Sequence, residues 1–162
     1  MADERSSGAW VIVASFLLAL QLAVFPLPLW LAWLRPEWVL LVLVYWAIAL
    51  PERVGLTTAL LLGLVMDVAE GAVLGQHMLG LAVVTVLARL LYERLRVFTL
   101  PQQAVVLFLL VATERLLGQW IQALEGVPAR SAAFLLPAVT SALLWPPLFL
   151  LLRGVRRRFA VR

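Results

Sequence analysis

The 162-residue sequence contains no cysteine, no lysine and only one histidine. The lack of cysteine excludes disulfides, iron–sulfur clusters and thiolate metal sites, and a single histidine excludes a zinc site built from several imidazoles. Charged residues are also scarce: they make up 14% of the chain, whereas 64% of its residues are hydrophobic. Such a chain has too little polar surface to cover a water-soluble globule of this size. The composition therefore predicts a membrane protein, and no cofactor is expected.

Prolines and charged residues divide the apolar sequence into six segments. A helix needs roughly 20 apolar residues to cross a bilayer core of about 30 Å, and these continuous runs do not alternate as barrel strands do. We therefore expect an all-α membrane protein with six transmembrane helices, folded as a single polytopic domain over residues 1–162. The expected spans are about 9–25, 37–50, 54–69, 75–92, 101–124 and 132–152, followed by a basic tail at 153–162.

The first two spans have unusual boundaries. The first has the length of a signal peptide, but Asp3 and Glu4 precede it and no clear cleavage site follows it, so a retained helix is expected. The second contains only fourteen residues, about 21 Å of helix, and needs flanking residues or a thinned bilayer to cross. Residues 26–38 lie between the two and combine prolines with three tryptophans, so this segment is expected in the membrane interface.

Arginines are distributed unevenly between the two ends of the predicted spans. With six spans both termini lie on one side, which carries nine arginines against two on the other. Because positive side chains accumulate on the cytoplasmic side, both termini are expected in the cytoplasm. The nine are Arg5, Arg53, Arg94, Arg96 and the five of the tail, and the two are Arg35 and Arg130. The tail is expected to contact anionic membrane lipid and not nucleic acid.

Polar residues gather in residues 62–77, which read LGLVMDVAEGAVLGQH and form the turn between the third and fourth spans. Asp67 and His77 straddle this turn and are placed to meet across it. Asp67 and Glu70 are either interfacial acids that end a helix or members of a polar site, and ligand type alone leaves open a metal site with His77. Close helix packing is expected at three glycines, Gly71, Gly75 and Gly80.

The fifth span has Glu114 and Arg115 near its midpoint, where a charge costs several kcal/mol unless it is paired or hydrated. Helical periodicity places both on one face with Gly118, Gln119, Gln122 and Glu125. That face covers the same depth as the polar turn. Arg115 is expected either to satisfy Glu114 or Asp67 as an ion pair, or to line a cavity for a ligand or a partner's helix. The predicted cavity or partner site comprises Asp67, Glu70, His77, Glu114, Arg115, Gln119 and Gln122.

Enzyme signatures are lacking in the sequence. It has no nucleophile elbow, no histidine–glutamate zinc motif and no phosphate-binding glycine loop. A serine–histidine dyad that uses His77 is open on geometry alone, but no serine stands in a recognised protease motif. The sequence therefore predicts a protein that is not an enzyme.

Residues 35–84 closely resemble the bacterial rod shape-determining protein family MreD. The likeness rests on the order and spacing of short motifs: Arg-Pro-Glu-Trp before the second span, Pro51, Arg53 and Gly55 after it, then Asp67 followed by Gly71 and LGQH. It continues more weakly through RLRVF and RLLGQWIQALEG and covers about two thirds of the chain.

The resemblance implies a six-helix, multi-pass protein of the bacterial cytoplasmic (inner) membrane that partners the bitopic protein MreC. It further implies a non-enzymatic scaffold in the elongation machinery, which contains the actin-like MreB, the polymerase RodA and a penicillin-binding transpeptidase. Such a scaffold helps couple MreB filaments to peptidoglycan synthesis and so maintains rod shape. The family's fold is similar to that of the S components of energy-coupling-factor transporters. The alternative function is therefore that of a small-molecule-binding membrane component of a transporter.

Overall fold

The computed structural model describes residues 8–128 and 131–161, in which every regular element is a helix. Arg5, Arg130 and Arg162, which the orientation argument counts, lie outside these residues, as do Asp3 and Glu4. The helices are α2 (Ala9–Val24), α3 (Leu29–Ala32), α4 (Trp38–Ala49), α5 (Leu56–Glu70), α6 (Gln76–Leu90), α7 (Tyr92–Val97), α8 (Leu100–Leu124), the 3-10 helix η1 (Ala132–Leu135) and α9 (Leu136–Arg158).

Each of the six segments expected to span the membrane contains a helix: α2, α4, α5, α6, α8 and α9. The largest difference in bounds concerns α9, which continues past the expected end at residue 152 to Arg158. Its last turn carries three arginines, and their positive charges are stabilised by the negative end of the helix dipole. By length and composition two helices, over Leu100–Leu124 and Ala133–Arg158, can cross a bilayer. That all six do so stays a prediction.

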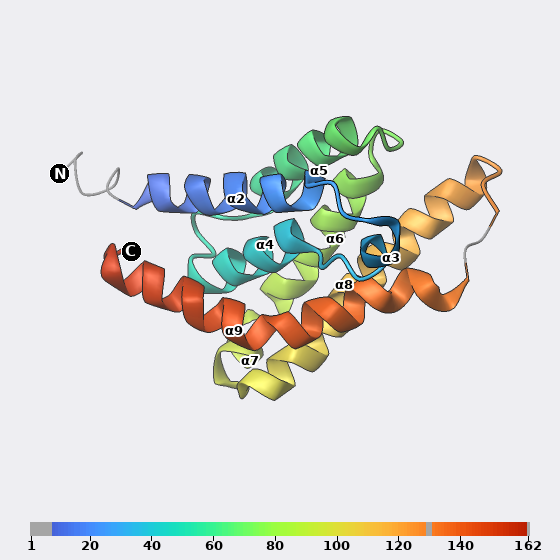
Figure 1. The fold of residues 1–162 in the computed structure, drawn as a ribbon. Coiled ribbons are helices and arrows are strands. Elements are labelled where there is room, and N and C mark those ends of the chain that lie inside the picture. Colours follow the sequence, from blue (N-terminus) through green and yellow to red (C-terminus); the bar gives the residue numbers. More distant parts are fainter. Residues whose placement is uncertain (1–7, 129–130, 162) are drawn as a thin grey trace.

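Helix α4 occupies the centre of the molecule, between α2 and α9 (Figure 1). Its residues from Val39 to Ile48 are all buried, and they are apolar on every side of the helix. A helix without a polar face is stable only when other helices surround it. The short second span is therefore a core helix, covered by α2, α6 and α9.

Two helix hairpins, α5–α6 and α8–α9, complete the bundle, and α6 packs against α8. In the first hairpin a Cβ placed on Gly63 would lie 2.4 Å from Cα of Met78, so only glycine permits this approach of the two backbones. At the start of α8, Thr99 and Gln102 form a reciprocal capping box, in which the Thr99 N–H donates to Oε1 of Gln102 at 3.0 Å.

Helix α2 begins and helix α9 ends at the same end of the molecule (Figure 1). There the rings of Trp10 and Phe159 meet edge to face, with centroids 5.1 Å apart. The side chain of Val161 is buried against Gly8, where an added Cβ would lie 2.8 Å from it. These contacts join the first and last helices, and the arginines of α9 lie at this joined end.

Large apolar side chains cover much of the outer surface. On α5 alone six are exposed: Leu56, Leu60, Leu61, Leu64, Val65 and Val68. Others are exposed on α2, α8 and α9. Water-soluble monomers rarely expose apolar surface on this scale, whereas lipid tails cover it without cost. The outer surface is therefore that of a membrane protein.

Candidate functional site

The carboxylate of Asp67 holds the start of helix α6. Its Oδ2 accepts a hydrogen bond from the Gly75 N–H, and its Oδ1 accepts one from the His77 N–H, each at 2.8 Å. Oδ1 also lies 2.9 Å from Nδ1 of the His77 ring. The first N–H groups of a helix have no partner within it, and Gly75, at the cap position, has no side chain to accept from them. Asp67, which is 1% exposed, supplies that acceptor from the preceding helix.

Two of the three glycines predicted to allow close helix packing serve the turn instead. Gly71 ends α5 with φ of 62° and Gly75 precedes α6 with φ of 101°, and a Cβ on either would meet open space. Both positions require the left-handed backbone that glycine adopts without strain. The prediction holds for Gly80, where a Cβ would lie 2.8 Å from Cγ of Glu114. It was wrong for the other two, and it missed Gly63.

The meeting of Asp67 and His77 across the turn is confirmed, and Glu70 lies on the other side of the ring. Oε2 of Glu70 is 3.7 Å from Nε2 of His77, and its side chain is 35% exposed. Both oxygens of Asp67 are already committed to the start of α6. Within residues 8–128 and 131–161, no three acidic, histidine or cysteine side chains are arranged to hold a metal ion.

Arg115 of α8 forms its ion pair with Glu37, the residue that precedes α4. Nε of Arg115 is also 3.9 Å from Oε2 of Glu114, so the neighbour expected as a partner contributes a longer contact. The expected pair with Asp67 is wrong: the described carboxylates within ion-pair distance of Arg115 are Glu37 and Glu114, whereas Asp67 binds the start of α6. Glu37 was missed although it stands in the Arg-Pro-Glu-Trp motif, at the end of the second span nearest the polar turn.

The Arg-Pro-Glu-Trp motif joins four helices. The two Nη groups of Arg35 donate to the carbonyls of Ala23 and Phe25, at 2.5 and 2.7 Å, and so satisfy the end of α2. The backbone N–H of Glu37 donates to Oγ of Ser141 on α9 at 2.9 Å, while its carboxylate binds Arg115 on α8. The segment that carries the family resemblance is thus a structural joint.

Two adjoining cavities surround these polar groups. The first, of about 120 Å³, lies between α6, α8 and the start of α9, and the second, of about 210 Å³, lies towards α3 and α4. His77 and Arg115 line both. The first is also lined by Gln76, Glu114, Gln119 and Gln122, and the second by Arg35, Glu37 and Glu70. Six of the seven predicted cavity residues therefore lie on a cavity wall, and Asp67 lies on neither.

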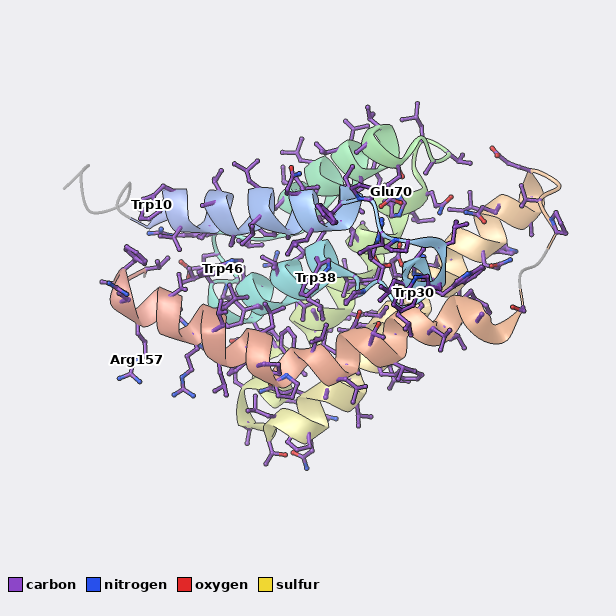
Figure 2. All side chains as sticks on the ribbon, viewed as in Figure 1. Trp10, Trp30, Trp38, Trp46, Glu70 and Arg157 are labelled. Carbon is purple, nitrogen blue, oxygen red and sulfur yellow. The ribbon has the colours of Figure 1, made fainter. Side chains whose placement is uncertain are left out.

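The first cavity is polar enough to hold water. Oε2 of Glu114 and Nε2 of Gln119 are buried and make no hydrogen bond to another described residue. Nε2 of Gln122 reaches Oε1 of Gln76 at a long 3.4 Å. Buried polar atoms are nearly always satisfied by protein or water, so this cavity suits several waters or a small polar group. Glu70, which lines the second cavity, lies far from Trp10 and Arg157 in Figure 2, as does Trp30.

Comparison with known proteins identifies a family that shares the part of the chain containing these polar residues. A family model described as rod shape-determining protein MreD matches residues 4–155, a range that contains both cavities and the joint around Glu37. The chain belongs to the MreD family. Among curated proteins, the rod shape-determining protein MreD of Haemophilus influenzae is 34% identical over 149 residues, which cover 92% of this chain and 92% of that protein. No solved structure matches the chain.

Membership of the MreD family confirms the resemblance read from the motifs and extends it from about two thirds of the chain to nearly all of it. It makes this a cell shape-determining membrane protein, in agreement with its apolar outer helices. The expected similarity of fold to the S components of energy-coupling-factor transporters stays a prediction. So does a partner-binding or ligand-binding role of the polar residues.

Proposed function

We propose that this protein is a non-enzymatic integral scaffold of the bacterial elongation machinery, multi-pass in the cytoplasmic (inner) membrane with both termini in the cytoplasm. It partners MreC and helps couple MreB filaments to peptidoglycan synthesis by RodA and a penicillin-binding transpeptidase. The observation that carries the proposal is the match to the MreD family over residues 4–155. The proposed partners are those that the family resemblance implies, and the arginine distribution supports the proposed orientation.

The geometry of the polar residues supports a scaffold. Asp67 joins α5 to α6, Glu37 joins α4 to α8 and α9, and Arg35 ends α2, so the charged groups fix helices to one another. Charged groups that bind partners on neighbouring helices favour one relative arrangement of those helices, because another arrangement separates each charge from its partner. A fixed outer surface is what a scaffold must offer its partners.

The alternative, a small-molecule-binding component of a transporter, has less support. Family membership does not favour it. Pockets for drug-sized ligands measure about 300–1,000 Å³, and neither polar cavity, at about 120 and 210 Å³, reaches that size by itself.

Depletion and affinity capture distinguish the two functions. Depletion of the scaffold should turn rods into spheres without changing nutrient uptake, and expression of the intact gene in the same cells should restore the rods. Capture of the tagged protein in mild detergent should recover a single-span protein with a periplasmic domain. Recovery of a coupling protein with ATPases, or an uptake defect in cells of normal shape, would contradict the proposal.

A further inference from the structure

A third cavity, of about 250 Å³, lies where the arginine-bearing ends of α7 and α9 meet α4 and α8. Three arginines from two helices line it: Arg96, Arg153 and Arg156. Within the described part of the chain none of the three forms an ion pair with a carboxylate, and no acidic residue lines the cavity. We call it the arginine-lined cavity.

The positions of the arginines on α9 separate this cavity from the rest of the basic tail. Phe149, Arg153 and Arg156 are spaced four and three residues apart, so they share one face of the helix, and all three line the cavity. Arg157 and Arg158 do not line it; both are exposed, as is Arg153, whereas Arg156 is partly buried. The side chain of Arg157 points away from the bundle (Figure 2). We call Arg153 and Arg156 the inward pair because they line the cavity, and Arg157 and Arg158, which carry the same charge and do not line it, the outward pair.

The guanidinium groups retain unused donors. Arg156 donates its Nε–H to the Val161 carbonyl at 3.3 Å and is also hydrogen-bonded to Tyr45, so only part of its five N–H donors is used and the others remain for a ligand. Arg96 packs over the ring of Tyr92, with its Cζ 5.8 Å from the centroid. The buried Tyr45 lines the same cavity as Arg153 and Arg156. Like charges around one small space repel one another, and a bound anion relieves that repulsion.

The wall opposite α9 is held rigidly by Gln103, which is 4% exposed. Its Nε2 donates to the carbonyls of Leu95 and Phe98, at 2.8 and 3.2 Å, and its Oε1 accepts from Nε1 of Trp145 at 3.0 Å. These bonds tie the end of α7, which carries Arg96, to α8 and α9. The amide of Gln103 is therefore occupied in fixing the end of α7, and with it the backbone of Arg96, within the bundle.

We propose that the arginine-lined cavity binds a phosphate group, carried by an anionic phospholipid headgroup or by a soluble phosphoester. Guanidinium groups bind phosphate oxygens in pairs, and their planar forks match phosphate better than a point charge does. Basic pockets between membrane helices are suited to lipid headgroups. The partly exposed ring of Phe149, which also lines the cavity, provides an apolar surface for the glycerol and the first acyl carbons of a lipid.

Ligand titration of the purified full-length protein in mild detergent tests this proposal. Native mass spectrometry would count adducts of dioleoyl phosphatidylglycerol in one arm and of glycerol 3-phosphate in the other. Dioleoylglycerol and glycerol, which lack phosphate, are the respective controls. Binding in the first arm alone identifies a lipid headgroup as the source, and binding in the second arm identifies a soluble phosphoester. Either result supports a phosphate site, and no phosphate-dependent binding in either arm overturns it.

Paired variants locate the site. Arg153→Gln with Arg156→Gln should weaken phosphate-dependent binding at least tenfold, whereas Arg157→Gln with Arg158→Gln removes the same charge and should leave binding within twofold. If the first pair fails to fold, Arg96→Gln with Arg94→Gln as its control repeats the comparison on α7, since Arg94 does not line the cavity. Equal weakening by the inward and outward substitutions would show diffuse attraction to the tail and overturn the proposal.

Discussion

Asp67 accepts a hydrogen bond from the backbone N–H of His77 at 2.8 Å with the same oxygen that lies 2.9 Å from Nδ1 of the His77 ring. One carboxylate thus caps helix α6 from the preceding helix and orients the histidine that separates the two polar cavities. Both residues are buried, at 1% and 8% exposed. The α5–α6 turn therefore depends on a charged group that has no access to water.

Substitution of Asp67 by alanine should destabilise the protein by about 2 kcal/mol or more, because the buried N–H groups of Gly75 and His77 lose their acceptor. Asp67→Asn keeps one acceptor oxygen and should cost less. Thermal unfolding of the purified protein in detergent measures both. Glu70→Ala is the control, since that partly exposed side chain lies 3.7 Å from the ring and should change stability by about 0.5 kcal/mol or less. An Asp67→Ala protein as stable as the wild type would refute the capping role.

The Glu37–Arg115 ion pair predicts a specific coupling. Glu37→Gln and Arg115→Gln should each destabilise the protein, and the double variant should recover part of the loss, with a coupling of about 1 kcal/mol. The side chain of Arg115 is 34% exposed, so each single substitution should cost less than the 3–5 kcal/mol typical of removing one partner of a fully buried pair. The coupling is obtained from the unfolding free energies, measured in detergent, of the wild type, the two single variants and the double variant.

Asp67→Asn combined with Arg115→Gln supplies the contrast, because the two side chains serve different partners and their effects should add. Glu125→Gln, at the exposed end of α8, controls for a general loss of negative charge. Strong coupling of Arg115 to Asp67 and none to Glu37 would show that the pairing seen here is incorrect.

Gly63→Ala should destabilise the protein by about 1–3 kcal/mol, because the new Cβ would lie 2.4 Å from Cα of Met78 and force α5 away from α6. Gly154→Ala is the matched control, also within a helix, where an added Cβ meets open space. Its higher helix propensity should leave stability unchanged or raise it by up to about 1 kcal/mol. Thermal unfolding would distinguish the two, and similar values for both would exclude close backbone contact at Gly63.

The predicted orientation can be tested by labelling single cysteines, because the natural chain has none. Val127→Cys, in the loop after α8, should react with a membrane-impermeant maleimide in intact cells whose outer membrane has been permeabilised. Val97→Cys and Glu52→Cys, both exposed at the arginine-rich end, should react only after detergent is added. The reverse pattern would place the termini outside the cytoplasm.

Local sequence was sufficient for the helices and for one contact. The six apolar segments became helices because hydrophobic runs bounded by proline, glycine and charge are determined by nearby residues. The shared face of Glu114, Gln119 and Gln122 followed from the helical repeat, and all three line one cavity. Asp67 and His77 were expected to meet because they straddle the same short turn.

Only the tertiary structure decided which carboxylate forms the ion pair with Arg115. Glu37, Asp67 and Glu114 all lie near the same end of the bundle, and helical periodicity does not rank them. The pairing depends on how α4, α5 and α8 pack against one another, which places Asp67 against the start of α6 and Glu37 against Arg115. The arginine-lined cavity likewise requires four helices to converge, because Arg96 and Arg153 are far apart in the chain. Sequence alone determined which residues are charged and at which end of the bundle they lie, whereas interhelical packing determined their partners.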